Sequence, residues 1–194
     1  DCCLEFLHGN PDSLKVVDPV MGDNGKPYST YTPELIRRMK ELVDAADVIT
    51  PNLTETCMLL GEECPPVMSV AQARSWLARL SDKPGIVVIK GVPLIDDDGQ
   101  KLSNVGFDRE SGSFWRIDWD HIPVHYPGTG DIFTSVLTAS LLKGESLPIA
   151  LNRATTFTEI AVKTTYSYGT EPRLGVLFED CLSWLMTNTV LCDY

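Results

Sequence analysis

The sequence has little positive charge and no long apolar run. Only 16 of its 194 residues are Lys or Arg, whereas 27 are Asp or Glu, and the formal net charge is −11. Affinity for nucleic acid comes mostly from Lys and Arg on phosphates, so this balance argues against a nucleic-acid partner. No apolar stretch approaches the roughly 18 residues that suggest a membrane span, and we therefore predict no membrane partner. A small phosphorylated ligand remains compatible, because it needs only a local positive field.

Cysteine motifs of the zinc and redox type are also missing. None of the six cysteines has the C-x-x-C spacing of such sites. The first residues, DCCLEFLHGN, lack a basic region followed by an apolar one, so no targeting segment is predicted. We expect reduced, mostly structural thiols in a cytoplasmic protein. The cysteines are Cys2, Cys3, Cys57, Cys64, Cys181 and Cys192.

What the sequence does contain is an alternation of short apolar runs and helical patterns. In the helix expected over 32–46, Thr32 is the predicted N-cap and Pro33 fits the first turn. The run GIVVIKG is continuously apolar, which is typical of a strand buried on both faces. Alternating strands and helices indicate a parallel α/β sheet. Strands are expected within 13–20, 47–52 and 85–91, and helices within 32–46, 52–61 and 69–80.

The pattern changes after residue 93. Residues 94–118 contain short runs split by Asp-Gly and Ser-Gly pairs, which predict hairpins at one edge of the sheet. Helical patterns follow over 130–144, 147–166 and about 174–186. The sequence contains no internal repeat, low-complexity tract or linker, so we expect residues 1–194 to form one domain.

Polar residues follow each of the three expected strands. In open α/β sheets, ligands bind outside the carboxyl ends of the strands, which meet at one rim. Asp18 ends the first strand, either as a strand-terminating acid or as a carboxylate near a metal or a phosphate. Lys90 ends the third strand, and a buried lysine is rarely left unpaired. A phosphate would serve as its partner, and so would Asp18 or Glu55.

Asn52 and Glu55 form an N-x-x-E pattern at a helix start. One interpretation is structural, because Asn is a favoured N-cap and a Glu three residues later completes a capping box. The other is that Glu55 holds a water on Mg²⁺, an ion that keeps several waters and binds few protein carboxylates. The pattern alone leaves both interpretations open.

The stretch HYPGTGDIFTS places an acid directly behind a glycine-rich turn. Gly128, Thr129 and Gly130 can point successive N–H groups into one concavity, and the following helix adds the positive end of its dipole. Such a nest suits the negative charge of a phosphoryl group in transfer. Asp131 would then stand at its mouth, within reach of an attacking hydroxyl. The alternative is a turn with a capping acid, and the polar ends of three strands on one expected rim weigh against it.

Three motifs together resemble the pyridoxal kinases, which belong to the ribokinase-like superfamily of ATP-dependent small-molecule kinases. They are VVDPVMGDNGKPY, DVITPNLTE and GTGDIF, in this order. The resemblance runs from about residue 15 to residue 166 and implies a ribokinase-like three-layer α/β/α sandwich with a largely parallel sheet. The chain does not begin with Met and lacks the segment that carries the family's first strands. We therefore expect it to be the C-terminal, ATP-binding portion of the fold.

The resemblance also implies a reaction. Asp131 would be the catalytic base, taking the proton from the 5′-hydroxymethyl group of pyridoxal, pyridoxine or pyridoxamine. The anion hole would consist of Gly128, Thr129 and Gly130.

The ATP side of the site is implied in the same way. Asn52 and Lys90 would contact the ATP phosphates. Glu55 and Asp18 would organise Mg²⁺. The implied partners are ATP and a B6 vitamer, and the implied cofactor is Mg²⁺. A monovalent cation and a homodimer are both compatible with the family, although no residue of this sequence indicates either.

Two alternatives stay open. A hydroxymethylpyrimidine kinase of thiamine synthesis looks similar, but a cysteine typically follows the G-T-G there, so Asp131 favours the pyridoxal kinases. A non-catalytic nucleotide-binding remnant would also fit, because most contacts to the vitamin ring belong to the segment that the chain lacks.

Overall fold

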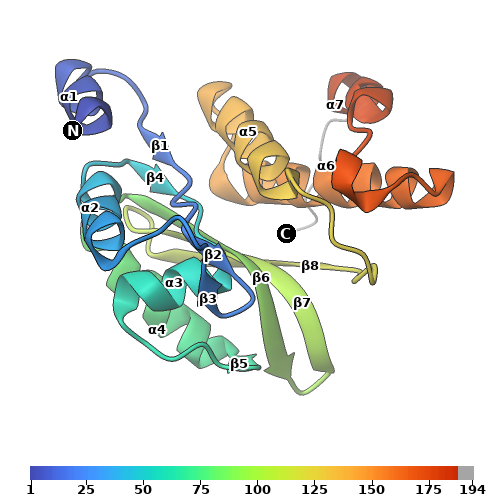
Figure 1. Cartoon of the computed structure of the whole chain (residues 1–194), viewed down its shortest axis with the longest axis horizontal. Coiled ribbons are helices and arrows are strands. Elements are labelled where there is room, and N and C mark those ends of the chain that lie inside the picture. Colours follow the sequence, from blue (N-terminus) through green and yellow to red (C-terminus); the bar gives the residue numbers. More distant parts are fainter. Residues whose placement is uncertain (188–194) are drawn as a thin grey trace. The chain divides into compact units, whose positions relative to one another are not determined.

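Helices and strands alternate through the first part of the chain, as Figure 1 shows from blue to green. The computed structural model describes residues 1–187, and its contacts separate two units, Asp1–Arg116 and the residues from Ile117 onward. The elements up to the boundary are α1 (Cys2–Gly9), β1 (Val16–Val17), β2 (Gly22–Asp23), β3 (Lys26–Pro27), α2 (Pro33–Asp44), β4 (Val48–Ile49), α3 (Leu53–Leu60), β5 (Met68–Ser69), α4 (Val70–Leu80), β6 (Ile86–Asp96), β7 (Gly99–Asp108) and β8 (Ser113–Trp119), in which the boundary falls.

A mixed sheet forms the centre of the first unit. Its strand order is β1-β4-β6-β7-β8, and β5 pairs with β6 off this path. β1, β4 and β6 are parallel neighbours, with Val17 beside Ile49 and Ile49 beside Val87. β6 and β7 run antiparallel as a long ribbon, drawn in green in Figure 1. The α/β prediction is confirmed. β1 and β4 end level with each other, beside Val87, whereas β6 continues beyond them to Asp96.

The core of this unit lies between the central strands and the helices. Ile49, Val87 and Ile89 are fully buried. They share one apolar cluster with Trp76 and Leu77 of α4. Burying a side chain of this size stabilises a fold by about 1.5–3 kcal/mol relative to leaving it exposed. Val88 points to the opposite face of the sheet and is also fully buried, so the apolar run in β6 is buried on both faces, as its sequence predicted.

The predicted helix starts are confirmed by their caps. The Thr32 hydroxyl accepts a hydrogen bond from the Leu35 N–H at 3.3 Å, and the Ser69 hydroxyl accepts one from the Gln72 N–H at 3.2 Å. Each bond satisfies one of the N–H groups that a helix start leaves without an internal partner. At the other end of α3, Gly61 adopts a φ of 71°, a left-handed conformation in which glycine carries no steric penalty.

The sheet departs from the prediction in strand length. β6 continues past its apolar run to Asp96, with a register shift between Ile89 and Val92 where Gly91 has a φ of 64°. Glycine tolerates this conformation, so the strand passes through the irregularity instead of ending. The expected hairpin is present, but the runs are not short: β7 has 10 residues and β8 has 7.

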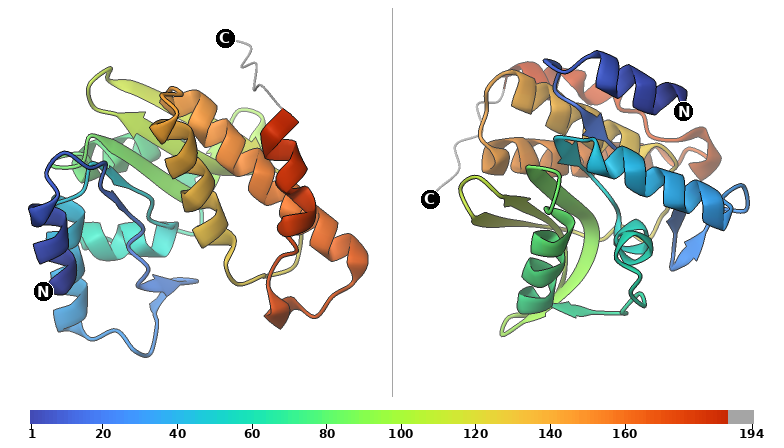
Figure 2. Two further views of the ribbon diagram at one scale, coloured as in Figure 1. Left: turned by 90° about the horizontal axis from the view of Figure 1, so that it is seen from above. Right: turned by 90° about the vertical axis from the view of Figure 1, so that its left-hand side faces the viewer.

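The second unit is mainly helical over its described residues. α5 (Thr129–Leu142) and α6 (Leu147–Tyr168) lie side by side, drawn in light and darker orange in Figure 2. They bury Phe133 and Leu137 from α5 and Leu151 and Phe157 from α6. Both helices agree with the predicted segments.

The single helix predicted over about 174–186 is wrong. Two short 3-10 turns, η1 (Pro172–Leu174) and η2 (Glu179–Cys181), are followed by α7 (Leu182–Thr187). Gly175 adopts a φ of 79° and a ψ of −165°, which no helix accommodates, so the chain turns there.

Two findings concern membrane spans and cysteines. No helix within residues 1–187 has the length and apolar character needed to cross a membrane. Cys2, Cys3, Cys57, Cys64 and Cys181 are free thiols, and Cys192 lies outside the described residues.

Candidate active site

Lys90 and Asp18 form an ion pair. Asp18 directly follows β1, whereas Lys90 lies within β6 and does not end that strand, contrary to the prediction, because β6 continues to Asp96. The Lys90 Nζ lies 2.9 Å from each carboxylate oxygen of Asp18, and the two side chains are only 14% and 15% exposed. The Lys90 N–H donates to the Pro51 carbonyl at 2.9 Å, which joins the middle of β6 to the turn before α3. Of the partners considered for Lys90, Asp18 is the one the structure provides.

Asn52 and Glu55 form a complete capping box at the start of α3. The Asn52 side-chain oxygen accepts from the Glu55 N–H at 2.9 Å, and the Glu55 carboxylate accepts from the Asn52 N–H at 2.7 Å. The Asn52 side-chain amide also donates to the Gly22 carbonyl at 2.8 Å. The structural interpretation of N-x-x-E is therefore confirmed.

Glu55 has a second contact that ties it to the loop after β1. Its other carboxylate oxygen accepts a hydrogen bond from the Met21 N–H at 3.1 Å. Glu55 is 2% exposed, and Met21 is fully buried. One carboxylate thus fixes both the start of α3 and the loop that carries Asp18, which places the two acids and Lys90 near one another.

Burial dominates the electrostatics of Glu55. Burial, with a smaller contribution from the charge of Asp18, raises the pKa of its carboxyl to about 7, although the N–H groups of Asn52 and Met21 and the charge of Lys90 lower it. The pKa of Tyr28 is also raised, by burial first and then by Asp23 and Glu55. A carboxyl with a pKa near 7 is readily ionised by a nearby positive charge, so a bound cation would favour the charged form of Glu55.

A small hairpin completes this cluster, and sequence reasoning missed it. β2 pairs with β3 through a turn in which Asn24 and Gly25 have φ values of 52° and 75°. The Thr54 hydroxyl accepts from the Gly25 N–H at 2.9 Å and so anchors the turn to α3. The Asn-Gly pair within GDNGK is the signal that would have predicted a two-residue hairpin.

The chemistry of these donors fits Mg²⁺ held largely through water. Within residues 1–187, no three His, Cys, Asp or Glu side chains are grouped to hold a metal. Mg²⁺ needs no such cage, because it usually keeps several waters and binds one or two carboxylates together with substrate phosphates. Each Glu55 oxygen already accepts one N–H bond and keeps a second lone pair, so Glu55 can still accept from a metal-bound water.

The glycine-rich turn begins α5 in the second unit. Gly128 is the N-cap with a φ of 86°, and no side chain of the described residues caps this helix start. The Thr129 hydroxyl donates to the carbonyl of Tyr126, a buried residue, at 3.3 Å. The first N–H groups of α5 are therefore free to face an anion, as the first N–H groups of a helix have no intrahelical acceptor.

Asp131 lies in the first turn of α5 with an exposed side chain. Among the described residues, nothing donates a hydrogen bond to its carboxylate; the Ser135 hydroxyl bonds its backbone carbonyl instead, at 2.7 Å. The acid therefore does not cap the turn, contrary to the simplest interpretation of G-T-G-D. An unengaged carboxylate beside free N–H groups is available to accept a proton.

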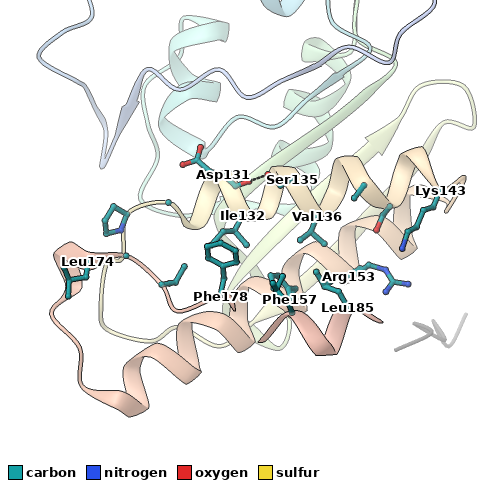
Figure 3. Close-up of a pocket in the computed structure, with 17 residues that line it drawn as sticks. Asp131, Ile132, Ser135, Val136, Lys143, Arg153, Phe157, Leu174, Phe178 and Leu185 are labelled. Atoms are coloured by element: carbon teal, nitrogen blue, oxygen red, sulfur yellow. Dashed lines mark hydrogen bonds between the residues drawn. The ribbon is translucent and has the colours of Figure 1, made fainter. Parts of the chain in front are cut away.

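A cavity of about 630 Å³ lies in the second unit beside this turn. Figure 3 shows Asp131 near one end of it, with its carboxylate pointing away from Phe178, and Lys143 and Arg153 toward the other end. Arg153 is held by Glu145, with nitrogen and oxygen 2.8 Å apart. The volume is that of a typical small-molecule site. Its apolar lining includes Ile132, Val136, Phe157, Leu174, Phe178 and Leu185.

The predicted site residues thus form two groups. Asp18, Asn52, Glu55 and Lys90 are brought together in the first unit. The Gly128–Asp131 turn forms the second group, in the second unit. That both groups serve one reaction stays a prediction.

A family model described as phosphomethylpyrimidine kinase matches residues 2–174. The chain belongs to this family. The hydroxymethylpyrimidine/phosphomethylpyrimidine kinase of Haemophilus influenzae is 29% identical over 169 residues, which cover 87% of this chain and 62% of that protein.

Solved structures of related proteins share the fold of this chain. A Bacteroides thetaiotaomicron protein assigned to the phosphomethylpyrimidine kinases and solved with pyridoxal is 40% identical, with a TM-score of 0.90 over 98% of this chain and 67% of its own. Leishmania donovani pyridoxal kinase, solved with ADP and pyridoxamine, is 25% identical, with a TM-score of 0.73 over 94% of this chain and 62% of its own. The predicted fold family is confirmed. The chain spans about two thirds of the length of these relatives.

Proposed function

We propose that the protein transfers the γ-phosphoryl group of ATP to the 5′-hydroxymethyl group of a B6 vitamer. The observation that carries the proposal is the start of α5, where free N–H groups stand beside the unengaged carboxylate of Asp131. Phosphoryl transfer needs little covalent chemistry from a protein, and catalysis comes from positioning and from stabilising charge. Membership of a kinase family supports the same reaction.

In this reaction Asp131 accepts the proton of the substrate hydroxyl. The hydroxyl oxygen then bonds to the γ-phosphorus while the bond from that phosphorus to the β,γ-bridging oxygen breaks, and ADP leaves with the electron pair. The N–H groups at Gly128, Thr129 and Gly130 would hold the charge on the transferred group, aided by the helix dipole.

The first-unit cluster would bind the nucleotide phosphates. Lys90 would share its charge between Asp18 and a phosphate oxygen, and the Asn52 amide would help to orient the phosphates. Glu55 and Asp18 would hold Mg²⁺, Glu55 through water. The ion supplies positive charge that neutralises the phosphates when it is bound.

The B6 vitamers and hydroxymethylpyrimidine are competing acceptors. The family model and the H. influenzae relative favour the pyrimidine. Asp131 in place of the cysteine typical of the pyrimidine kinases favours a B6 vitamer, as does the resemblance of the MGDNGKPY stretch to pyridoxal kinases. The relative with the highest identity given above was solved with pyridoxal, which adds support. We therefore place the B6 vitamers first.

A side-by-side assay of the full-length protein decides between them. ADP formation and phosphorylated product would be measured with ATP, Mg²⁺ and either pyridoxal, pyridoxine or hydroxymethylpyrimidine at equal concentration. We expect the highest kcat/KM with a B6 vitamer. A higher value with hydroxymethylpyrimidine would assign the second function. Nucleotide binding without turnover on any acceptor would assign a non-catalytic protein.

The metal role of Glu55 has its own test. Glu55→Gln should raise the Mg²⁺ concentration that gives half-maximal activity, because a neutral amide binds a metal-held water less well than a carboxylate does. An unchanged Mg²⁺ titration would leave Glu55 with its capping role alone.

A further inference from the structure

The thiols of Cys57 and Cys64 lie in contact, with their Sγ atoms 3.0 Å apart. Cys57 projects from α3 into the core and is 4% exposed, whereas Cys64 is exposed. Neither thiol takes part in the proposed kinase chemistry. The seven-residue separation of the pair matches no common cysteine motif, so the sequence did not indicate it.

The fold holds the two thiols together through three contacts. Gly61 reverses the chain at the end of α3, and the N–H groups of Gly61 and Glu62 both bond to the Cys57 carbonyl. Glu62 then pairs with Arg79 of α4, with nitrogen and oxygen 2.8 Å apart. The returning segment therefore runs back along α3, where the Cys64 thiol lies 3.7 Å from the carbonyl oxygen of Leu53.

We infer that Cys57 and Cys64 are a modification site at which a reversible disulfide forms by exchange with a low-molecular-weight disulfide. The two sulfurs are 3.0 Å apart and a disulfide bond measures about 2.05 Å, so an approach of about 1 Å suffices. Residues Gly61–Cys64 are exposed and can supply that movement while α3 stays in place.

The exposed thiol reacts first. The Cys64 thiolate attacks one sulfur of the external disulfide, whose other half leaves as a thiol after taking up a proton. The Cys57 sulfur, having lost its proton, then attacks the Cys64 sulfur and displaces the second thiol. Two protein thiols are oxidised by two electrons, one external disulfide is reduced to two thiols, and two protons are transferred with them.

Tryptic mapping tests this assignment directly, because Glu41–Arg74 is one tryptic peptide whose only cysteines are Cys57 and Cys64. The folded full chain would be incubated with oxidised glutathione, unfolded, treated with iodoacetamide and digested. We expect the peptide to be lighter by two hydrogen atoms and free of alkyl groups, and dithiothreitol applied before alkylation should restore two alkylation sites. A peptide carrying two alkyl groups without dithiothreitol, or a persistent glutathione adduct on either thiol, would overturn the inference.

Two serine variants separate the steps. Cys57→Ser should leave a stable glutathione adduct on Cys64, because the resolving thiol is gone. Cys64→Ser should leave Cys57 unmodified in the folded protein, because Cys57 is buried. The same result for both variants, either adduct or no adduct, would contradict the proposed order of attack. Cys181, buried beside the Thr164 hydroxyl, is the internal control and should remain reduced.

Discussion

Because of Glu55, the free energy of unfolding should decrease as the pH rises from about 5 to about 8. Burial raises the pKa of its carboxyl from 4.5 to about 7 in the folded protein. Between these values the native state keeps a proton that the unfolded state has lost. Because the native state binds more protons there, this contribution to stability is fully present below about pH 4.5 and is lost as the pH rises through about 7.

The size of the effect follows from the two pKa values. Between about pH 5 and pH 8, the shift from 4.5 to about 7 lowers the free energy of unfolding by roughly 2–3 kcal/mol. Glu55→Gln cannot ionise and lacks this dependence. The unfolding free energy of the wild type minus that of the variant should therefore fall by roughly 2–3 kcal/mol over the same range. Urea unfolding followed by tryptophan fluorescence measures it, since Trp76 is 5% exposed in the same apolar core.

Glu63→Gln is the matched control. Glu63 is an exposed acid eight residues along the chain from Glu55. The unfolding free energy of the wild type minus that of Glu63→Gln should therefore not change over this pH range. A wild-type minus Glu55→Gln difference that stays constant or rises between about pH 5 and pH 8 would refute the reasoning. It would mean that the backbone N–H groups and Lys90 outweigh burial and keep the carboxylate charged.

Three further substitutions test contacts of the first unit by urea unfolding. Thr54→Val removes the hydroxyl that accepts from the Gly25 N–H and should cost about 1 kcal/mol. Thr56→Val should be neutral or stabilising by up to about 1 kcal/mol, because the Thr56 hydroxyl is buried without a hydrogen-bond partner in the described chain. A larger loss for Thr56→Val than for Thr54→Val would contradict both assignments. Lys90→Met should cost about 3 kcal/mol, since it removes one partner of a largely buried ion pair with Asp18. Unchanged stability would mean that the pair contributes nothing.

Local signals predicted helices α2 to α6 and the caps of several of them. The capping box of Asn52 and Glu55, the N-caps of α2 and α4, and the left-handed Gly61 all depend on residues within a few positions of one another. Such contacts form wherever the helix forms, so the sequence pattern was sufficient. Asp18 was also among the predicted partners of Lys90, because each of the two residues follows the apolar run of a parallel strand.

Contacts between distant segments could not be predicted from patterns. The bond from the Met21 N–H to Glu55 spans 34 residues and requires a loop whose course only the folded chain defines. The extension of β6 past Gly91 and the break of the last helix at Gly175 depend on backbone conformations that glycine permits but does not require. For the same reason, the approach of Cys64 to Cys57 becomes visible only in three dimensions.

The most direct test of the proposed function is phosphoryl transfer by Asp131→Asn. The variant keeps the shape of the side chain and removes the base, so turnover with the preferred acceptor should fall by about 10²–10⁴-fold, while the Kd for ATP, measured by calorimetry, stays the same. Asp180→Asn, which changes another exposed acid of the second unit, should keep wild-type turnover. Near-wild-type turnover of Asp131→Asn would contradict the assignment of Asp131 as the base, and with it the proposed mechanism.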